Sequence, residues 1–341
     1  MKLIKKAFLL PLLVVLGPAA QDAAPAASED ALAGHINNNP TNQKEQLTLL
    51  TQEIYKVKTE IVASNFRQEY GDHVAMRRLL YPANTQGHEA IPAYLFTGRH
   101  APEGKKHPAL ILLHGGDHTQ LSEDFFPWIA EAVERGYIVL FPEYRGSSGY
   151  GDAIYENDYG FTDFADVMAA TAYLAGLDNA DPNRLGIIGH SRGGMLALRA
   201  LEAEPKRFAA GVDLAALTDM VAFMGYKEEA RREDIASQRD FGGKMPGKNL
   251  MPYLEISPAL FVDKIETPLL VLSTTHDTNV PYELNNKRIV EALKAYGKVF
   301  ENHVYDSAPG SHGFPFVDGP DGRDCHRRVW EFLAKYLHPP A

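Results

Sequence analysis

Short apolar segments alternate with helical patterns over most of this 341-residue chain. The segments contain few polar residues, which is typical of strands buried on both faces of a parallel sheet. They lie at residues 89–96, 109–114, 137–142, 185–189, 208–214 and 268–273. Helical patterns occupy residues 122–135, 162–177, 192–204, 282–296 and 324–337. This order predicts an α/β fold, with a mostly parallel sheet and helices on both of its faces.

The sequence Gly189-His190-Ser191-Arg192-Gly193 joins one predicted strand to the helix that follows it. A turn this sharp leaves no room for Cβ atoms two residues before and after the serine, which explains both glycines. The serine would then stand at the N-terminus of a helix, where the dipole favours developing negative charge. Because this is the nucleophile elbow pattern in its expected context, we predict that Ser191 is a nucleophile.

A serine hydroxyl is a weak nucleophile, so it needs a base and a group that orients the base. Asp277 follows a predicted strand, and His312 lies in a Gly-Ser-His-Gly loop after a further alternating segment. The chain order serine, acid, histidine is that of the α/β-hydrolase fold. We therefore predict that Ser191, Asp277 and His312 form a catalytic triad, with Asp213 and Asp306 as the alternative acids.

A second loop, His114-Gly-Gly-Asp117, also follows a predicted strand. The backbone N–H groups of Gly116 and Arg192 are the predicted oxyanion hole, in which the loss of one donor typically costs about 3 to 4 kcal/mol in the transition state. The Arg192 side chain has two interpretations. It selects a substrate that carries a carboxylate, or it forms a structural ion pair.

Several further motifs resemble one family. They are the stretch from Glu143 to Gly151 (Glu-Tyr-Arg-Gly-Ser-Ser-Gly-Tyr-Gly), the stretch from Asp181 to Gly194 that contains the nucleophile elbow, Thr267-Pro-Leu-Leu, and Asp277-x-x-Val-Pro281. Over about residues 85–338 the chain resembles the catalytic domain of the prolyl oligopeptidase family of serine hydrolases.

The resemblance implies the same triad and the same oxyanion amides. We also predict that Tyr144 and Tyr150, both in the first of these stretches, bind substrate. The sequence differs from the family in two respects. We expect no N-terminal propeller of the kind that filters peptides by size, and Arg192 stands where relatives often have tyrosine.

The N-terminus has the pattern of a secretory signal peptide. Three lysines precede an apolar run of about ten residues, which is too short for a permanent membrane span. We predict a signal peptide over residues 1–20, with cleavage at the latest near residue 27, and export to the periplasm or the extracellular space. Residues 21–46 are predicted as a flexible lead-in and residues 47–341 as the catalytic domain, with a small cap at about 218–256.

Composition excludes several other functions. The net charge of −10 disfavours nucleic acid as a partner, and the single cysteine, Cys325, excludes a disulfide within the chain. The glycine-rich stretch at 242–249 lacks the Ser or Thr and the preceding strand of a phosphate-binding loop. The predicted chemistry needs neither a metal nor a cofactor.

The sequence therefore predicts an exported serine hydrolase that cleaves a small ester or a short peptide through an acyl-enzyme. A peptidase follows from the resemblance, and a carboxylesterase follows from the missing propeller and the short cap. A non-catalytic binding protein on a hydrolase scaffold is the third hypothesis. The sequence does not specify the oligomeric state.

Overall fold

The computed structural model describes residues 40–83, 90–101 and 104–340, and it divides the chain into two compact units, residues 1–50 and 51–341. The predicted signal peptide and residues 21–39 lie outside the described residues. The predicted lead-in is wrong for residues 40–46, which belong to helix α2 (Pro40–Tyr70). Proline in the first turn and the Gln, Lys and Glu residues that follow it favour a helix there.

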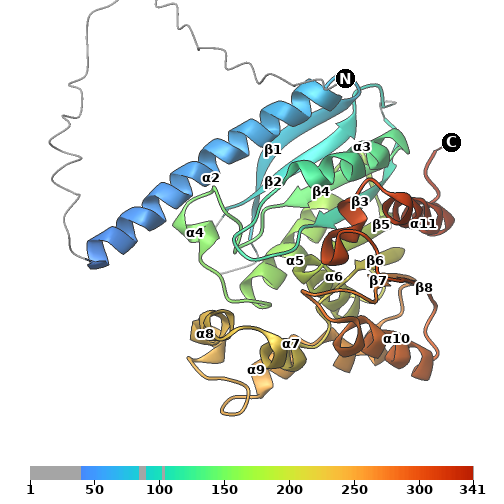
Figure 1. Ribbon diagram of the computed structural model, residues 1–341. Coiled ribbons are helices and arrows are strands. Elements are labelled where there is room, and N and C mark those ends of the chain that lie inside the picture. The colour runs from blue at the N-terminus through green and yellow to red at the C-terminus, as the bar shows by residue number, and fades with distance from the viewer. Residues whose placement is uncertain (1–39, 84–89, 102–103, 341) are drawn as a thin grey trace, which may run out of the picture. The chain divides into compact units, whose positions relative to one another are not determined.

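A single sheet runs through the second unit, and in the described residues it contains eight strands in the order β1-β2-β4-β3-β5-β6-β7-β8 (Figure 1). The first two pairings in this order are antiparallel, and all pairings from β4 to β8 are parallel. The strands are β1 (Val74–Pro82), β2 (Ala90–Gly98), β3 (His107–Leu113), β4 (Ile138–Pro142), β5 (Ala180–His190), β6 (Ala210–Leu214), β7 (Leu269–Thr274) and β8 (Phe300–Tyr305).

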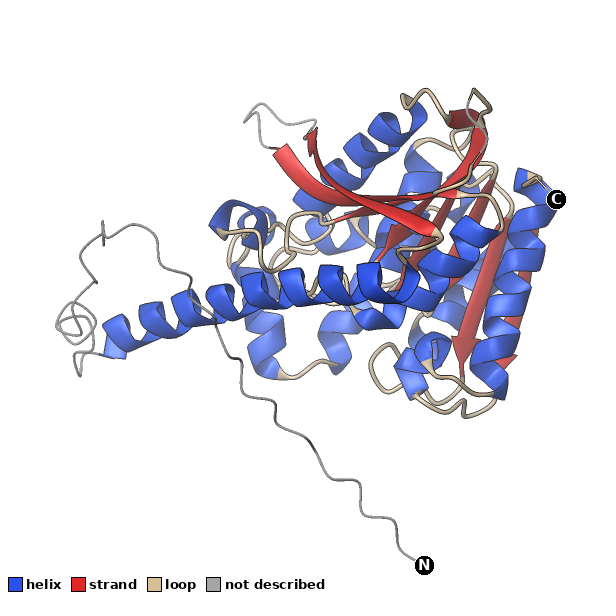
Figure 2. Ribbon diagram, turned by 90° about the horizontal axis from the view of Figure 1, so that it is seen from above, coloured by secondary structure: helices blue, strands red, loops and turns tan. Residues whose placement is uncertain are grey.

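Helices cover both faces of this sheet (Figure 2). One core packs between the sheet and α5, α6 and α10, and a second core packs between the sheet and α2, α3 and α11. The longer helices after α2 are α3 (Phe126–Glu134), α5 (Thr162–Ala175), α6 (Arg192–Ala203), α10 (Asn286–Ala295) and α11 (Pro320–Leu337). This arrangement confirms the predicted α/β-hydrolase architecture.

The insertion predicted at 218–256 is helical and lies between β6 and β7. It contains α7 (Met220–Tyr226), α8 (Glu229–Ser237) and α9 (Met251–Glu255), which gather at one end of the second unit (Figure 1). Phe223 and Met224 are both buried in the larger core, and Phe223 also lines a cavity of about 740 Å³. The glycine-rich stretch follows a 3-10 turn rather than a strand, in agreement with the rejection of a phosphate-binding loop.

No helix in the described part of the chain combines the length and the apolarity needed to cross a membrane.

Candidate active site

Loops that follow neighbouring parallel strands meet at one edge of the sheet. Gly116 follows β3, Ser191 follows β5, Asp277 follows β7 and His312 follows β8. Three of these residues, Gly116, Ser191 and His312, line one cavity of about 740 Å³. The fold therefore brings the four predicted residues to one place, as expected for the carboxyl ends of strands in such a sheet.

The backbone at Ser191 has the strained conformation of a nucleophile elbow, with φ 59° and ψ −119°. A Cβ atom at Gly189 would lie 2.1 Å from the carbonyl oxygen of Gly193. A Cβ atom at Gly193 would lie 2.4 Å from the carbonyl oxygen of His114. A side chain is therefore excluded at both positions. This confirms the steric reason that the sequence suggested for the two glycines.

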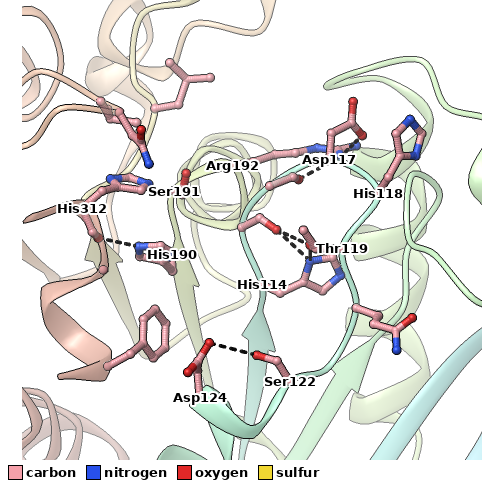
Figure 3. A pocket seen from close by; sticks show the side chains of 18 of the residues that line it. His114, Asp117, His118, Thr119, Ser122, Asp124, His190, Ser191, Arg192 and His312 are labelled. Atoms are coloured by element: carbon pink, nitrogen blue, oxygen red, sulfur yellow. Dashed lines mark hydrogen bonds and ion pairs between the residues drawn. The ribbon is translucent and has the colours of Figure 1, made fainter. Parts of the chain in front are cut away.

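Asp277 contacts His312 directly. His312 Nδ1 lies 2.7 Å from Asp277 Oδ2, and the other carboxylate oxygen accepts hydrogen bonds from the backbone N–H groups of Asn279 and Val280 at 2.9 and 2.7 Å. With Asp277 on Nδ1, the second ring nitrogen of His312 is left for the serine. In Figure 3 Ser191 lies beside the His312 ring.

The two alternative acids have other partners. Asp306 accepts a hydrogen bond from the Thr275 hydroxyl at 3.0 Å. Asp213 is fully buried and accepts hydrogen bonds from the Asn286 amide and from the backbone of Ala216. The structure thus favours Asp277 as the partner of His312.

Two residues that the sequence analysis did not single out hold His312 in place. His190 Nε2 lies 2.9 Å from the His312 carbonyl oxygen and donates a proton to it (Figure 3). Burial and the nearby His312 lower the pKa of His190 to about 3, so this ring is neutral at ordinary pH. Ser311 donates a hydrogen bond to the carbonyl oxygen of His276, at 2.6 Å, and thereby ties the histidine loop to the aspartate loop.

Two glycines follow β3, and the first of them lies against the nucleophile. A Cβ atom at Gly115 would come within 2.8 Å of Ser191 Cβ, and Gly116 has φ +74°. The Thr119 hydroxyl donates a hydrogen bond to the Gly115 carbonyl, at 2.5 Å. Because N–H and C=O are antiparallel in a trans peptide, the Gly116 N–H points away from Thr119. The predicted oxyanion hole rests on this direction of the Gly116 N–H and on the place of Arg192 in the first turn of α6, where N–H groups have no partner within the helix.

The Arg192 side chain forms a structural ion pair. Of the two interpretations of this side chain, the structure therefore favours the ion pair over the selection of a substrate carboxylate. It is 1% exposed, Nε lies 2.9 Å from Asp163 Oδ2, and Nη1 lies 2.6 Å from Asp117 Oδ1. Burial would lower the pKa of Arg192, but the carboxylates of Asp163 and Asp117 raise it. Nη1 also donates to the Gly116 carbonyl at 3.2 Å, so this arginine supports the oxyanion loop from behind.

The cap reaches the same loop through Arg231 of α8. Arg231 Nη1 lies 3.0 Å from Asp117 Oδ2, so Asp117 uses one oxygen for each arginine. Burial would raise the pKa of Asp117, but Arg192 and Arg231 lower it. The two guanidinium groups also lie over the ring of Tyr159, 4.4 and 5.6 Å from its centroid. Helix α8 thus contributes a partly buried ion pair as well as exposed charged residues.

The structure does not support the predicted substrate contacts of Tyr144 and Tyr150. Tyr144 is fully buried, and its hydroxyl donates to the carbonyl oxygen of His114, because it packs beneath the oxyanion loop. Tyr150 donates a hydrogen bond to Tyr94 at 3.1 Å and lines a separate cavity next to β1 and β2. Neither residue lines the cavity that contains Ser191.

Comparison with known proteins identifies the family of this chain. A model described as "Prolyl oligopeptidase family" matches residues 124–339. The acylamino-acid-releasing enzyme of Arabidopsis thaliana is 29% identical over 215 residues, which cover 61% of this chain and 28% of that protein. The uncharacterized peptidase YuxL of Bacillus subtilis is 29% identical over 197 residues, or 56% of this chain and 29% of that protein.

Solved structures share the fold. An acylaminoacyl peptidase in complex with Z-Gly-Gly-Phe-chloromethyl ketone superimposes with a TM-score of 0.66 at 21% identity, covering 79% of this chain and 43% of that one. A puromycin-hydrolyzing peptidase of Mycobacterium tuberculosis gives a TM-score of 0.65 at 24% identity. The match covers 77% of this chain and 40% of that one. The chain thus spans less than half the length of these relatives. Since the family match extends over more than half of the chain, this protein belongs to the prolyl oligopeptidase family.

Proposed function

We propose that this protein is an exported peptidase in which Ser191, His312 and Asp277 act as a catalytic triad. The observation that carries the proposal is the strained Ser191 backbone beside a histidine that is hydrogen-bonded to a buried aspartate. A Gly-Ser turn with only a structural role does not require a strained serine backbone next to a histidine–aspartate pair. In a nucleophile elbow the strained backbone exposes the serine hydroxyl to the substrate.

In the proposed reaction the Ser191 hydroxyl attacks a carbonyl carbon while His312 takes its proton. The Oγ–C bond forms, and the negative charge on the carbonyl oxygen is stabilised by the N–H groups of Gly116 and Arg192. His312 then returns the proton to the leaving group as the C–N bond breaks, which leaves an acyl-enzyme. Water hydrolyses this ester with His312 again as the base, and Asp277 stabilises the imidazolium throughout.

The names of the relatives point to peptides whose first residue carries an acyl group. Asp117 is the carboxylate closest in sequence to the oxyanion glycines, and both of its oxygens already contact arginines. Asp124 and Glu228 also line the cavity, but the carboxylate nearest the oxyanion loop is not available to a free amine. A substrate with a blocked, uncharged N-terminus needs no carboxylate there. A carboxylesterase remains the second candidate, because the same triad acts on esters, which have better leaving groups.

The test compares kcat/KM for an ester and an anilide that share one N-acyl amino acid, with Ser191→Ala as the blank. We expect turnover of both substrates, and a loss of at least about a thousandfold in Ser191→Ala and in His312→Ala. Turnover of the ester alone would make the protein an esterase. Absence of turnover together with no fluorophosphonate labelling of Ser191 would support the non-catalytic hypothesis.

Export is tested separately from activity. Expressed with its own N-terminus, the protein should accumulate outside the cytoplasm, and its mature N-terminus should lie between residues 20 and 28. A variant in which the three N-terminal lysines are replaced by glutamate should remain inside the cell. An unprocessed N-terminus on the exported protein would contradict a cleaved signal peptide.

A further inference from the structure

Helix α2 has an apolar face that points into solvent. Ile54, Val57 and Ile61 are 66%, 58% and 52% exposed, although β-branched side chains of this size are usually buried. The opposite side of the same helix packs against the hydrolase domain, where Thr59 and Phe66 are buried. Two sides of one helix are therefore apolar, and only one of them is covered in the described structure.

The spacing of this exposed face is that of a coiled coil. Ile54, Val57 and Ile61 are three and four residues apart, and the same spacing continues backward in the sequence through Leu50 and Leu47. With Ile54 at an a position of the heptad, Leu47 and Ile61 are also at a, and Leu50 and Val57 are at d. Isoleucine at a with leucine at d favours two parallel strands. The domain already holds α2 in helical form, so pairing carries no cost of nucleating a helix.

Charges beside the face identify the partner as a second copy of α2. In the same heptad register Glu53 and Glu60 occupy g positions, and Lys58 occupies an e position. All three side chains are exposed. In a parallel pair, Glu53 of one copy meets Lys58 of the other, and the contact occurs twice by symmetry. An antiparallel pair would instead bring glutamates at g against each other.

We propose that the exposed face of α2 binds α2 of a second copy of this chain, in parallel and in register. The helix also borders the site, because Tyr55 and Lys58 line the cavity that contains Ser191. The second copy would therefore stand at the rim of that cavity and limit the size of molecules that enter it. This consequence for substrates rests on the proposed function, whereas the pairing itself does not.

The pairing is tested by measuring molar mass in solution with the mature protein, across a wide range of concentrations. We expect twice the mass of one chain, and half of that value for Ile54→Asp combined with Ile61→Asp. Val299→Asp, at a side chain that is 60% exposed elsewhere, is the matched control and should leave the mass unchanged. An unchanged melting temperature and fluorophosphonate labelling will show that each variant is folded.

A charge exchange tests the register. Glu53→Lys alone should weaken the dimer, because it sets two lysines against each other, and adding Lys58→Glu should restore it. A monomeric wild-type chain, or a dimer that survives both aspartate substitutions, overturns the proposal. Failure of the double exchange to restore the dimer overturns the parallel register. Molar mass is independent of catalysis, so a monomer that labels at Ser191 contradicts only the pairing.

Discussion

Ser191 shows how single residues determine the chemistry of this site. Its backbone has φ 59° in a turn where a Cβ atom at Gly189 would meet the Gly193 carbonyl oxygen, and one at Gly193 would meet the His114 carbonyl oxygen. A backbone hydrogen bond from the Ser191 N–H to the Leu214 carbonyl oxygen, at 3.0 Å, stabilises this strained conformation. The neighbouring strand β6 thus fixes a conformation that the elbow sequence alone would not hold.

The acid of the proposed triad gives a prediction at this scale. Asp277→Asn should lower kcat by about 10⁴, because an amide cannot stabilise the imidazolium and favours the wrong tautomer of His312. Asp306→Asn, at the alternative acid, should leave kcat within about twofold. Steady-state kinetics on one N-acyl ester measures both variants. A larger loss in Asp306→Asn would reverse the assignment made from the 2.7 Å contact.

At the scale of elements, the cap and the oxyanion loop are coupled by two arginines around Asp117. Arg192 belongs to the elbow helix α6 and Arg231 to the cap helix α8, and each contacts a different oxygen of that carboxylate. A displacement of α8 would leave one carboxylate oxygen without a partner in a buried site. The cap therefore contributes to the position of Gly116, although it contains none of the proposed triad residues.

Arg231→Ala should consequently lower kcat more than it raises KM. We expect a loss of kcat on the order of tenfold, because Gly116 contributes more in the transition state than in the ground state. Arg231→Lys should recover part of the loss, and Arg232→Ala on the same helix is the control. A change confined to KM would mean that Arg231 binds substrate and does not position the loop.

Elements differ in how well the sequence predicts them. The buried parallel strands and the elbow were predictable, because continuous apolar runs and paired glycines are local signals. Helix α2 and strand β1 were not predicted. The apolar residues of α2 lie on two opposite sides, which obscures a simple amphipathic pattern. The partners of Arg192 could not be predicted either, since Asp117 and Asp163 come from distant parts of the chain.

Across the whole molecule, ionisable groups are buried close to the catalytic edge of the sheet, and they make stability depend on pH in opposite directions. Burial lowers the pKa of His114 to about 4 and that of His190 to about 3. Burial raises the pKa of Glu143 to about 8 and that of Asp213 to about 7. The unfolding free energy of the wild type, plotted against pH, therefore contains opposing contributions. The contribution of one group is obtained as the difference in unfolding free energy between wild type and a variant that lacks that group.

His190 should destabilise the fold in acid. The unfolded chain takes up a proton near the ordinary pKa of 6.5, whereas the folded chain does so only near 3. Stability is thus lost as the pH falls from 6.5 toward 3, on the order of 2 kcal/mol between pH 7 and pH 5. Urea titrations at pH 7 and pH 5 measure the free energy of unfolding. His190→Gln should lose less of it between these pH values than wild type, whereas the exposed control His276→Gln should lose as much as wild type. Equal pH slopes for His190→Gln and wild type would contradict a neutral buried ring.

Glu143 should change the pH dependence of stability in the opposite direction to His190. Its unfolded pKa is near 4.5 and its folded pKa near 8, so the unfolded chain releases a proton that the folded chain keeps. Stability is lost as the pH rises from 4.5 to 8. Glu143→Gln keeps the acceptor that Leu121 N–H binds at 2.9 Å and removes the ionisation. Relative to wild type, this variant should therefore gain on the order of 3 kcal/mol in unfolding free energy between pH 5 and pH 8. A constant difference over that range would mean that Glu143 does not change its ionisation in the folded chain as the pH rises.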